Sequence, residues 1–63
     1  MKVEGELARG YQVIILDSLE TVPGQLVEGD DQTGQITVRD KTGEVRQFSY
    51  GPRRIRIIHK YHR

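Results

Sequence analysis

The stretch Gln35-Ile36-Thr37-Val38-Arg39-Asp40-Lys41-Thr42-Gly43 decides the expected fold. Ile36 and Val38 alternate with polar residues, which is the period of two that a half-buried β-strand requires. The residues that follow, 40–43, have the composition of a hairpin turn and include a glycine for a positive φ. Residues 44–50 are then expected to return as the partner strand. The sequence therefore predicts a β-hairpin in the middle of the chain.

Further strands are expected on both sides of this hairpin. Residues 11–17 are rich in β-branched and aromatic residues, and both faces are apolar, which predicts a central, bent strand. In the last strand, Ile55 and Ile57 share one face and should point into the core. Ile58 lies on the opposite face, where we expect a neighbouring subunit or the N-terminal segment to cover it. The five expected strands cover residues 11–17, 25–28, 35–39, 44–50 and 53–60.

Glycines and prolines separate these strands and predict where the sheet bends. Pro23 has no N–H for a ladder, so it should stand at a strand start or a bulge. Gly24 and Gly29 would allow the sheet to curl, and residues 29–34 have a turn composition. Residues 6–9, between two glycines, allow at most one short N-terminal helical turn. The fold class expected is all-β: a small, five-stranded, strongly bent antiparallel barrel of the SH3-like type, as a single domain over residues 1–63.

Length and composition restrict the class of protein. A chain of 63 residues buries only about 60% of its unfolded surface, so it depends on a tight core or on self-association. Cysteine is absent, which excludes disulfides and thiolate metal sites. No apolar run approaches the roughly 18 residues of a membrane span, and the polar, acidic start has no features of a secretory signal. We therefore expect a cytoplasmic location and no membrane partner.

Charge is distributed unevenly along the chain. Residues 1–44 carry nine acids and four bases, a net charge of −5, whereas residues 45–63 carry six bases and no acid. The six bases are Arg46, Arg53, Arg54, Arg56, Lys60 and Arg63. Such a segregation favours a basic face for an anionic partner. Neutralisation between the two halves, within one chain or between neighbouring copies, explains the charges equally well.

Catalytic, metal and cofactor sites are not indicated by any motif. Ser18 and Ser49 have no nucleophile-elbow glycines around them, so we predict that the protein is not an enzyme. His59 and His62 have no third ligand at a suitable spacing, and a solvated basic tail is the favoured interpretation of both. No cofactor is expected.

The basic C-terminal part is the stronger indication of function. Residues 50–54, Tyr-Gly-Pro-Arg-Arg, place an aromatic ring beside two guanidinium groups in a turn. Residues 59–63, His-Lys-Tyr-His-Arg, again combine an aromatic ring with basic side chains, among them Lys60. Arginine pairs with phosphate and tyrosine stacks on bases, so this pattern favours RNA binding. The alternative is a solvated edge strand whose arginines prevent aggregation.

The chain also resembles the Sm-like (LSm) family over about residues 10–59. An apolar strand, residues 13–17, leads to Gly24-Gln25-Leu26-Val27-Glu28-Gly29-Asp30, which is similar to the glycine, apolar residue and aspartate of the first family motif. Residues 47–53, Gln-Phe-Ser-Tyr-Gly-Pro-Arg, followed by the isoleucines of residues 55–58, resemble the second motif. Gly51-Pro52-Arg53 stands where the family usually has Arg-Gly or Lys-His.

This resemblance implies a homo-oligomeric ring that binds single-stranded RNA without catalysis. Family members add the fourth strand of one subunit to the fifth strand of the next, which would also cover exposed sheet edges. Their RNA-facing loops follow the second and fourth strands. The implied contacts are base edges for Gln32 and Thr33, stacking for Tyr50 and phosphate for Arg53 and Arg54. The predicted nucleic-acid-binding residues are thus Asp30, Gln32, Thr33, Tyr50, Arg53, Arg54 and Lys60. The alternative function is a protein-interaction or structural module whose arginines pair with acidic neighbours.

Overall fold

The central hairpin forms as its alternating pattern predicts. In a computed structural model, which describes residues 1–60, β4 (Gln35–Arg39) pairs antiparallel with β5 (Val45–Ser49). The Asp40 carboxylate accepts hydrogen bonds from the backbone N–H groups of Thr42 (2.9 Å) and Glu44 (3.0 Å) and from the Thr42 hydroxyl. The Thr42 hydroxyl bond is the main cause that lowers the pKa of Asp40, so this exposed turn keeps an ionised carboxylate at its first position.

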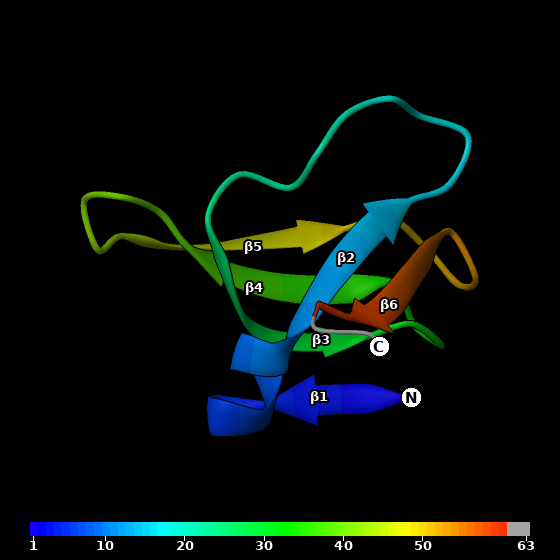
Figure 1. The fold of residues 1–63 in the computed structure, drawn as a ribbon. Coiled ribbons are helices and arrows are strands. Elements are labelled where there is room, and N and C mark those ends of the chain that lie inside the picture. Colours follow the sequence, from blue (N-terminus) through cyan, green and yellow to red (C-terminus); the bar gives the residue numbers. More distant parts are fainter. Residues whose placement is uncertain (61–63) are drawn as a thin grey trace.

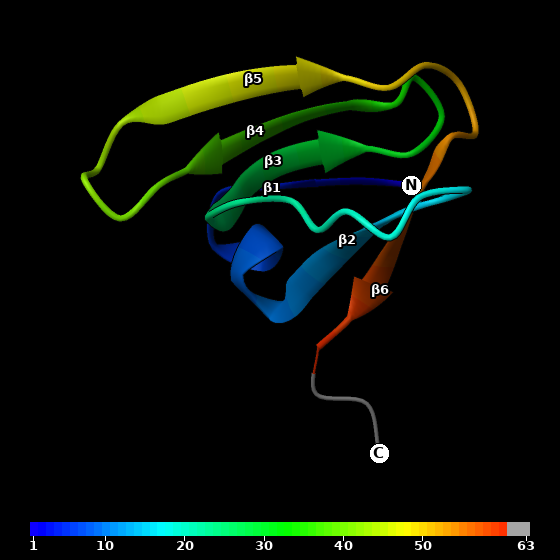
Figure 2. The same ribbon diagram turned by 90° about the horizontal axis from the view of Figure 1, so that it is seen from above.

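Six strands form two antiparallel sheets that lie one over the other (Figures 1 and 2). The larger sheet has the order β1-β3-β4-β5, and the smaller sheet pairs β2 with β6. In Figure 2 the larger sheet is a curved layer on one side, with β2 and β6 on the other side. The remaining elements are β1 (Lys2–Glu4), the 3₁₀ helix η1 (Gly5–Gly10), β2 (Tyr11–Ile15), β3 (Gln25–Asp30) and β6 (Ile55–His59).

The all-β class is confirmed, but the expected five-stranded closed barrel is wrong in strand count and in closure. Residues 1–60 form six strands, and their two sheets do not join into a barrel. The additional strand, β1, pairs with β3 through Val3 and Gly29. β1 pairs with residues 28–30 of β3 and β4 lies along the other edge, so β3 has a strand on each side and neither of them is β2. β2 is therefore not the central strand expected: it pairs with β6 and adds only an isolated bridge between Ile14 and Thr21.

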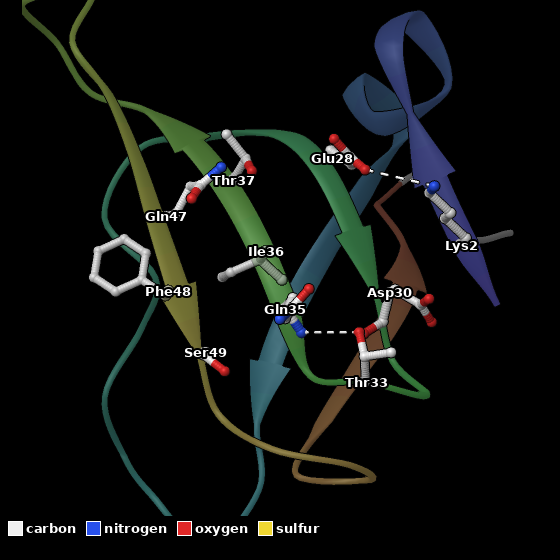
Figure 3. Close-up of a pocket in the computed structure, with 10 residues that line it drawn as sticks. All are labelled: Lys2, Glu28, Asp30, Thr33, Gln35, Ile36, Thr37, Gln47, Phe48 and Ser49. Carbon is white, nitrogen blue, oxygen red and sulfur yellow. Dashed lines mark hydrogen bonds and ion pairs between the residues drawn. The ribbon is translucent and has the colours of Figure 1, made fainter.

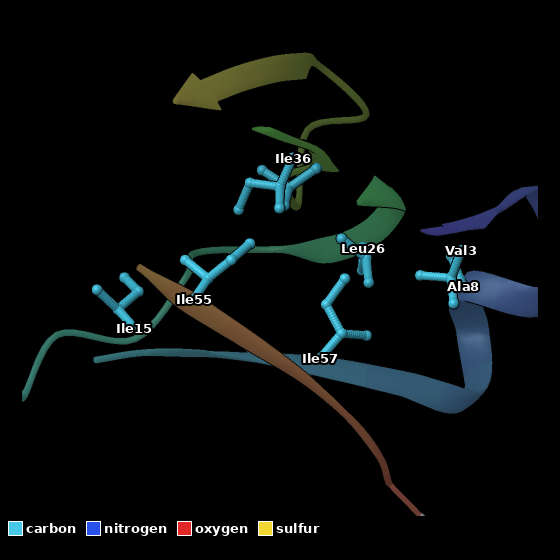
Figure 4. Close-up of a cluster of buried hydrophobic side chains, with 8 residues drawn as sticks. Val3, Ala8, Ile15, Leu26, Ile36, Ile55 and Ile57 are labelled. Atoms are coloured by element: carbon cyan, nitrogen blue, oxygen red, sulfur yellow. The ribbon is translucent and has the colours of Figure 1, made fainter. Parts of the chain in front are cut away.

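The core lies between the two sheets and uses the faces that alternation predicts (Figure 4). Ile36 and Val38 point inward from β4, and Ile55 and Ile57 point inward from β6. Ile58, on the other face of β6, is half-buried. The buried side chains are Val3, Ala8, Ile15, Leu26, Ile36, Val38, Ile55 and Ile57. A core of eight small and branched side chains is thin, in keeping with the short chain.

The N-terminal helix is longer than the single turn expected. η1 has six residues, which is about two turns of a 3₁₀ helix, and its Ala8 is 1% exposed. This helix links β1 to β2 and covers one end of the core. Within residues 1–60, no helix is long and apolar enough to cross a membrane.

The bend of β3 is a bulge one residue after Leu26. The register with β4 shifts between Leu26 and Glu28, which leaves Val27 as the extra residue. Pro23 lies two residues before the first residue of β3, so it stands neither at the strand start nor at the bulge, the two positions where it was expected. β3 also continues into residues 29 and 30, where a turn was expected. Gly29 is closely packed, because a Cβ there would lie 3.3 Å from the side chains of Ile36, Ile57 and Leu26, which is tighter than an ordinary contact.

Candidate nucleic-acid interface

Two loops that lie far apart in the sequence meet at one end of the molecule. The backbone N–H of Tyr50 donates to the carbonyl of Gly34 (2.9 Å), and the N–H of Arg53 donates to the carbonyl of Asp31 (3.3 Å). These bonds join the turn of residues 31–34 to the loop of residues 50–54, and we call the pair the joined loops. The joined loops and the end of β3 bring together six of the seven predicted site residues: Asp30, Gln32, Thr33, Tyr50, Arg53 and Arg54.

Gly34 makes this contact possible. Its φ is 76°, and a Cβ built on it would lie 1.9 Å from the carbonyl oxygen of Gly51. Only a residue without a side chain lets the two backbones approach so closely. The contact between the joined loops is therefore a property of the backbone and does not depend on the exposed side chains around it.

Two of the predicted site residues, Asp30 and Thr33, are used partly to shape their own turn. The Asp30 carboxylate accepts the backbone N–H of Gln32 at 2.9 Å, and the Thr33 hydroxyl accepts the N–H of Gln35 at 3.4 Å. These are the local side-chain to backbone bonds that stabilise turns. The Gln32 side chain is exposed.

Tyr50 is half-buried and its ring already has an aromatic neighbour. The ring centroids of Tyr50 and Phe48 are 6.3 Å apart and the rings are 19° from parallel. Burial, followed by the charge of Glu20, raises the pKa of the Tyr50 hydroxyl above its ordinary value, so the phenol is neutral at physiological pH. Phe48 is therefore a neighbour that a base stacking on the Tyr50 ring would meet.

The arginines beside the joined loops have exposed side chains. Among residues 1–60, none of Arg53, Arg54 and Arg56 forms an ion pair, whereas Arg46 pairs with Asp40 and Glu44. A hollow next to the joined loops is lined by Leu16, Asp31, Gln32, Pro52, Arg53, Ile55 and Arg56. Arg56 was not among the predicted site residues, although its position in the acid-free segment was a signal that could have found it.

The one acid among the described residues of this hollow is balanced by a cation. The Asp31 carboxylate lies 2.7 Å from the N-terminal ammonium group, and the Asp31 N–H donates to the Met1 carbonyl. This pairing reduces the repulsion that Asp31 would exert on a phosphate at Arg53. Asp31 therefore links Met1, the residue before β1, to the joined loops.

Lys60 does not lie with the other predicted site residues. It follows β6 at the end opposite to Arg54, six residues along the strand, which is about 20 Å at 3.3 Å per residue. Its backbone N–H donates to the Gly10 carbonyl at 2.8 Å, which holds it beside the end of η1. The rest of the predicted basic terminus, residues 61–63, lies outside the described residues.

The outer face of the larger sheet has a different chemistry (Figure 3). Lys2 on β1 forms an ion pair with Glu28 at 3.6 Å, and Asp30 lies on the same face. The other polar residues of this hollow are neutral: Thr33, Gln35, Thr37, Gln47 and Ser49. Two carboxylates against one lysine disfavour a polyanion, so the anion-binding chemistry of the described residues is concentrated around the joined loops.

No family model, curated protein or solved structure matches this chain. The resemblance to Sm-like proteins therefore remains a prediction. Among residues 1–60, no group of three or more His, Cys, Asp or Glu side chains could hold a metal ion.

Proposed function

We propose that this protein binds single-stranded RNA, without catalysing a reaction, at the face formed by the joined loops. The observation that carries the proposal is the backbone contact between residues 31–34 and 50–54, which groups Arg53 and Arg54 with the polar Gln32 and a partly open Tyr50 ring. Arginines without acidic partners neutralise phosphates, and an aromatic ring stacks on an unpaired base. The roles are phosphate contacts for the arginines and base contacts for Tyr50 and Gln32.

The backbone of Arg53 gives the proposal further support. Its φ is 60°, a left-handed conformation in which glycine is the favoured residue and arginine costs about 1 kcal/mol or more. The presence of arginine at this position is therefore not explained by the stability of the backbone. On this proposal, the reason is a guanidinium group held at the edge of the RNA site.

Replacing Arg53 and Arg54 by glutamine is expected to weaken RNA binding and to reduce its salt dependence. Each single-strand phosphate contact contributes about 0.7 to the slope of log K against log salt, so the double variant should lose about 1.4 of slope. Fluorescence anisotropy with a labelled single strand of about 12 nucleotides, titrated from low to high salt, measures this slope.

The matched control removes the same charge elsewhere. Arg9 and Arg39 line a hollow beside η1, away from the joined loops, and Arg9→Gln with Arg39→Gln should leave the slope nearly unchanged. If both double variants lose the same amount of slope, the effect comes from net charge alone, and the proposed site is wrong. If the native protein binds no single strand at low salt, the alternative holds, a protein-interaction or structural module whose arginines pair with acidic groups.

We also propose that the chain is an Sm-like fold whose barrel is opened by β1, and that copies assemble into a ring. In the Sm-like family, which this chain resembles, the strands that join subunits correspond to β5 and β6. Within residues 1–60, β5 and β6 each have one edge without a ladder partner, and a second copy could supply it. Ile58 on β6 is half-buried on the outer face, where a neighbouring subunit would cover it.

Ile58→Asp is expected to shift the protein to smaller species in native mass spectrometry, because it places an unpaired charge in the proposed contact. Its far-ultraviolet circular dichroism should remain that of a β protein, since Ile58 is not a core residue. Leu19→Asp is the control: it makes the same change at a fully exposed loop position and should leave the mass distribution unaltered. A native protein that is already monomeric contradicts the ring but not the RNA site.

A further inference from the structure

A cavity opens between the two sheets on the side where β2 and β3 do not pair. Its volume is about 220 Å³, and it is lined by Tyr11, Gln12, Val13, Thr21, Val22, Gly24, Leu26, Val38 and Lys60. The cavity lies where the two sheets are not joined by a ladder, because β2 pairs with β6 and not with β3. It lies away from the joined loops and shares none of their residues.

The cavity lining has an apolar part and a polar part. Val13, Val22, Leu26 and Val38 supply the apolar part, and Leu26 and Val38 belong to the buried core. Tyr11, Gln12 and Thr21 add hydrogen-bonding groups, and Lys60 adds the only charge that the described residues bring to this lining. Apolar walls with a few converging polar groups are the usual composition of a small-molecule site.

The lack of an acid among the described lining residues suits this cavity to an anion. The hollow of the outer sheet face contains Glu28 and Asp30, the hollow beside the joined loops contains Asp31, and the one beside η1 contains Glu6. The cavity between the sheets instead combines an apolar wall with a single lysine. Its complement is a molecule with an apolar body and one negative charge.

We propose that this cavity binds a small monocarboxylic acid with an apolar body, of the size of benzoate or a short-chain fatty acid. A cavity of about 150 Å³ accommodates benzene, so about 220 Å³ has room for a six-membered ring and a carboxylate. The Lys60 ammonium group pairs with the carboxylate. The valines and Leu26 contact the ring or alkyl chain. This site is independent of RNA binding, and it accounts for the position of Lys60 apart from the other predicted site residues.

The test is a titration of the ¹⁵N-labelled protein with benzoate, and separately with benzyl alcohol, followed by two-dimensional NMR. Benzoate should shift the backbone amides of Val13, Val22 and Leu26 saturably, and benzyl alcohol should bind several-fold more weakly because it lacks the charge. Lys60→Met should weaken benzoate binding up to about fivefold, as expected for an exposed ion pair, and leave the alcohol unaffected. The Lys60 side chain is exposed, so this variant is expected to fold.

Two further variants test whether benzoate occupies this cavity and no other part of the surface. Val22→Phe should fill the apolar part and reduce the binding of both compounds, with folding checked by circular dichroism. Arg53→Gln with Arg54→Gln should leave benzoate affinity unchanged. The proposal is overturned if benzoate causes no saturable shift, if its shifts centre on residues 50–54, or if Lys60→Met binds benzoate as well as the native protein does.

Discussion

Gly34→Ala is expected to remove at least about 4 kcal/mol from the free energy of unfolding, which places it among the rare severe substitutions. The new Cβ would lie 1.9 Å from the carbonyl oxygen of Gly51 and 2.5 Å from its carbonyl carbon, and both are backbone atoms that cannot rotate away. A φ of 76° adds the cost of a side chain in left-handed conformation. The whole free energy of unfolding of a domain of this length is only about 3–9 kcal/mol, so a loss of this size removes from nearly half of it to all of it.

Gly43→Ala separates the steric contact from the cost of the backbone conformation. Gly43 has a similar φ of 86°, but a Cβ there meets nothing within 4 Å. Gly43→Ala should therefore lower the free energy of unfolding by only about 1–2 kcal/mol. Urea unfolding followed by circular dichroism compares the two variants. Equal losses would mean that the joined loops do not touch at Gly34, and the candidate interface would lose its structural basis.

Gly24→Val is expected to prevent folding. The sequence predicted that Gly24 allows the sheet to curl, and in the structure a Cβ on Gly24 would lie 2.4 Å from the carbonyl oxygen of Arg39. A β-branched residue at a φ of 106° is also strained by itself. The clash separates the start of β3 from the end of β4, the strand pair that carries Leu26 and Val38 into the core.

Gly5→Val serves as the control, because Gly5 also has a positive φ, 61°, but no atom within 4 Å of its Cβ position. Thermal melting and amide hydrogen exchange should show a folded Gly5→Val variant with reduced stability and a Gly24→Val variant without protected core amides. If Gly24→Val melts like the native protein, the chain before β3 does not pack against the end of β4 as described.

Local patterns were sufficient for most of the strands. The alternation of Ile36 and Val38 predicted β4 and its inward face, and Ile55 and Ile57 did the same for β6. Asp40 and Gly43 predicted the hairpin turn between β4 and β5. These predictions succeeded because strand alternation and turn chemistry depend on residues that are neighbours in the chain.

The candidate site was predictable only in part. The acid-free C-terminal segment indicated the arginines, and the resemblance to Sm-like proteins selected the two loops that the structure brings together. Neither could indicate that Asp31 pairs with the N-terminal ammonium group, or that the Phe48 ring lies beside the Tyr50 ring. Lys60 was grouped with the arginines by sequence proximity, but a five-residue strand separates their positions in space.

The sequence by itself determined the all-β class, the central hairpin and the inward faces of β4 and β6. Only the tertiary structure decided that β1 exists and that the sheets stay open. A three-residue strand with one inward apolar side chain, Val3, has no periodicity to detect, and its stability comes from the edge of β3 that it pairs with. Two segments, β1 and β2, could compete for that edge, and each edge accepts one strand. The outcome depends on the packing of the whole chain, and it leaves the cavity between the sheets beside Lys60.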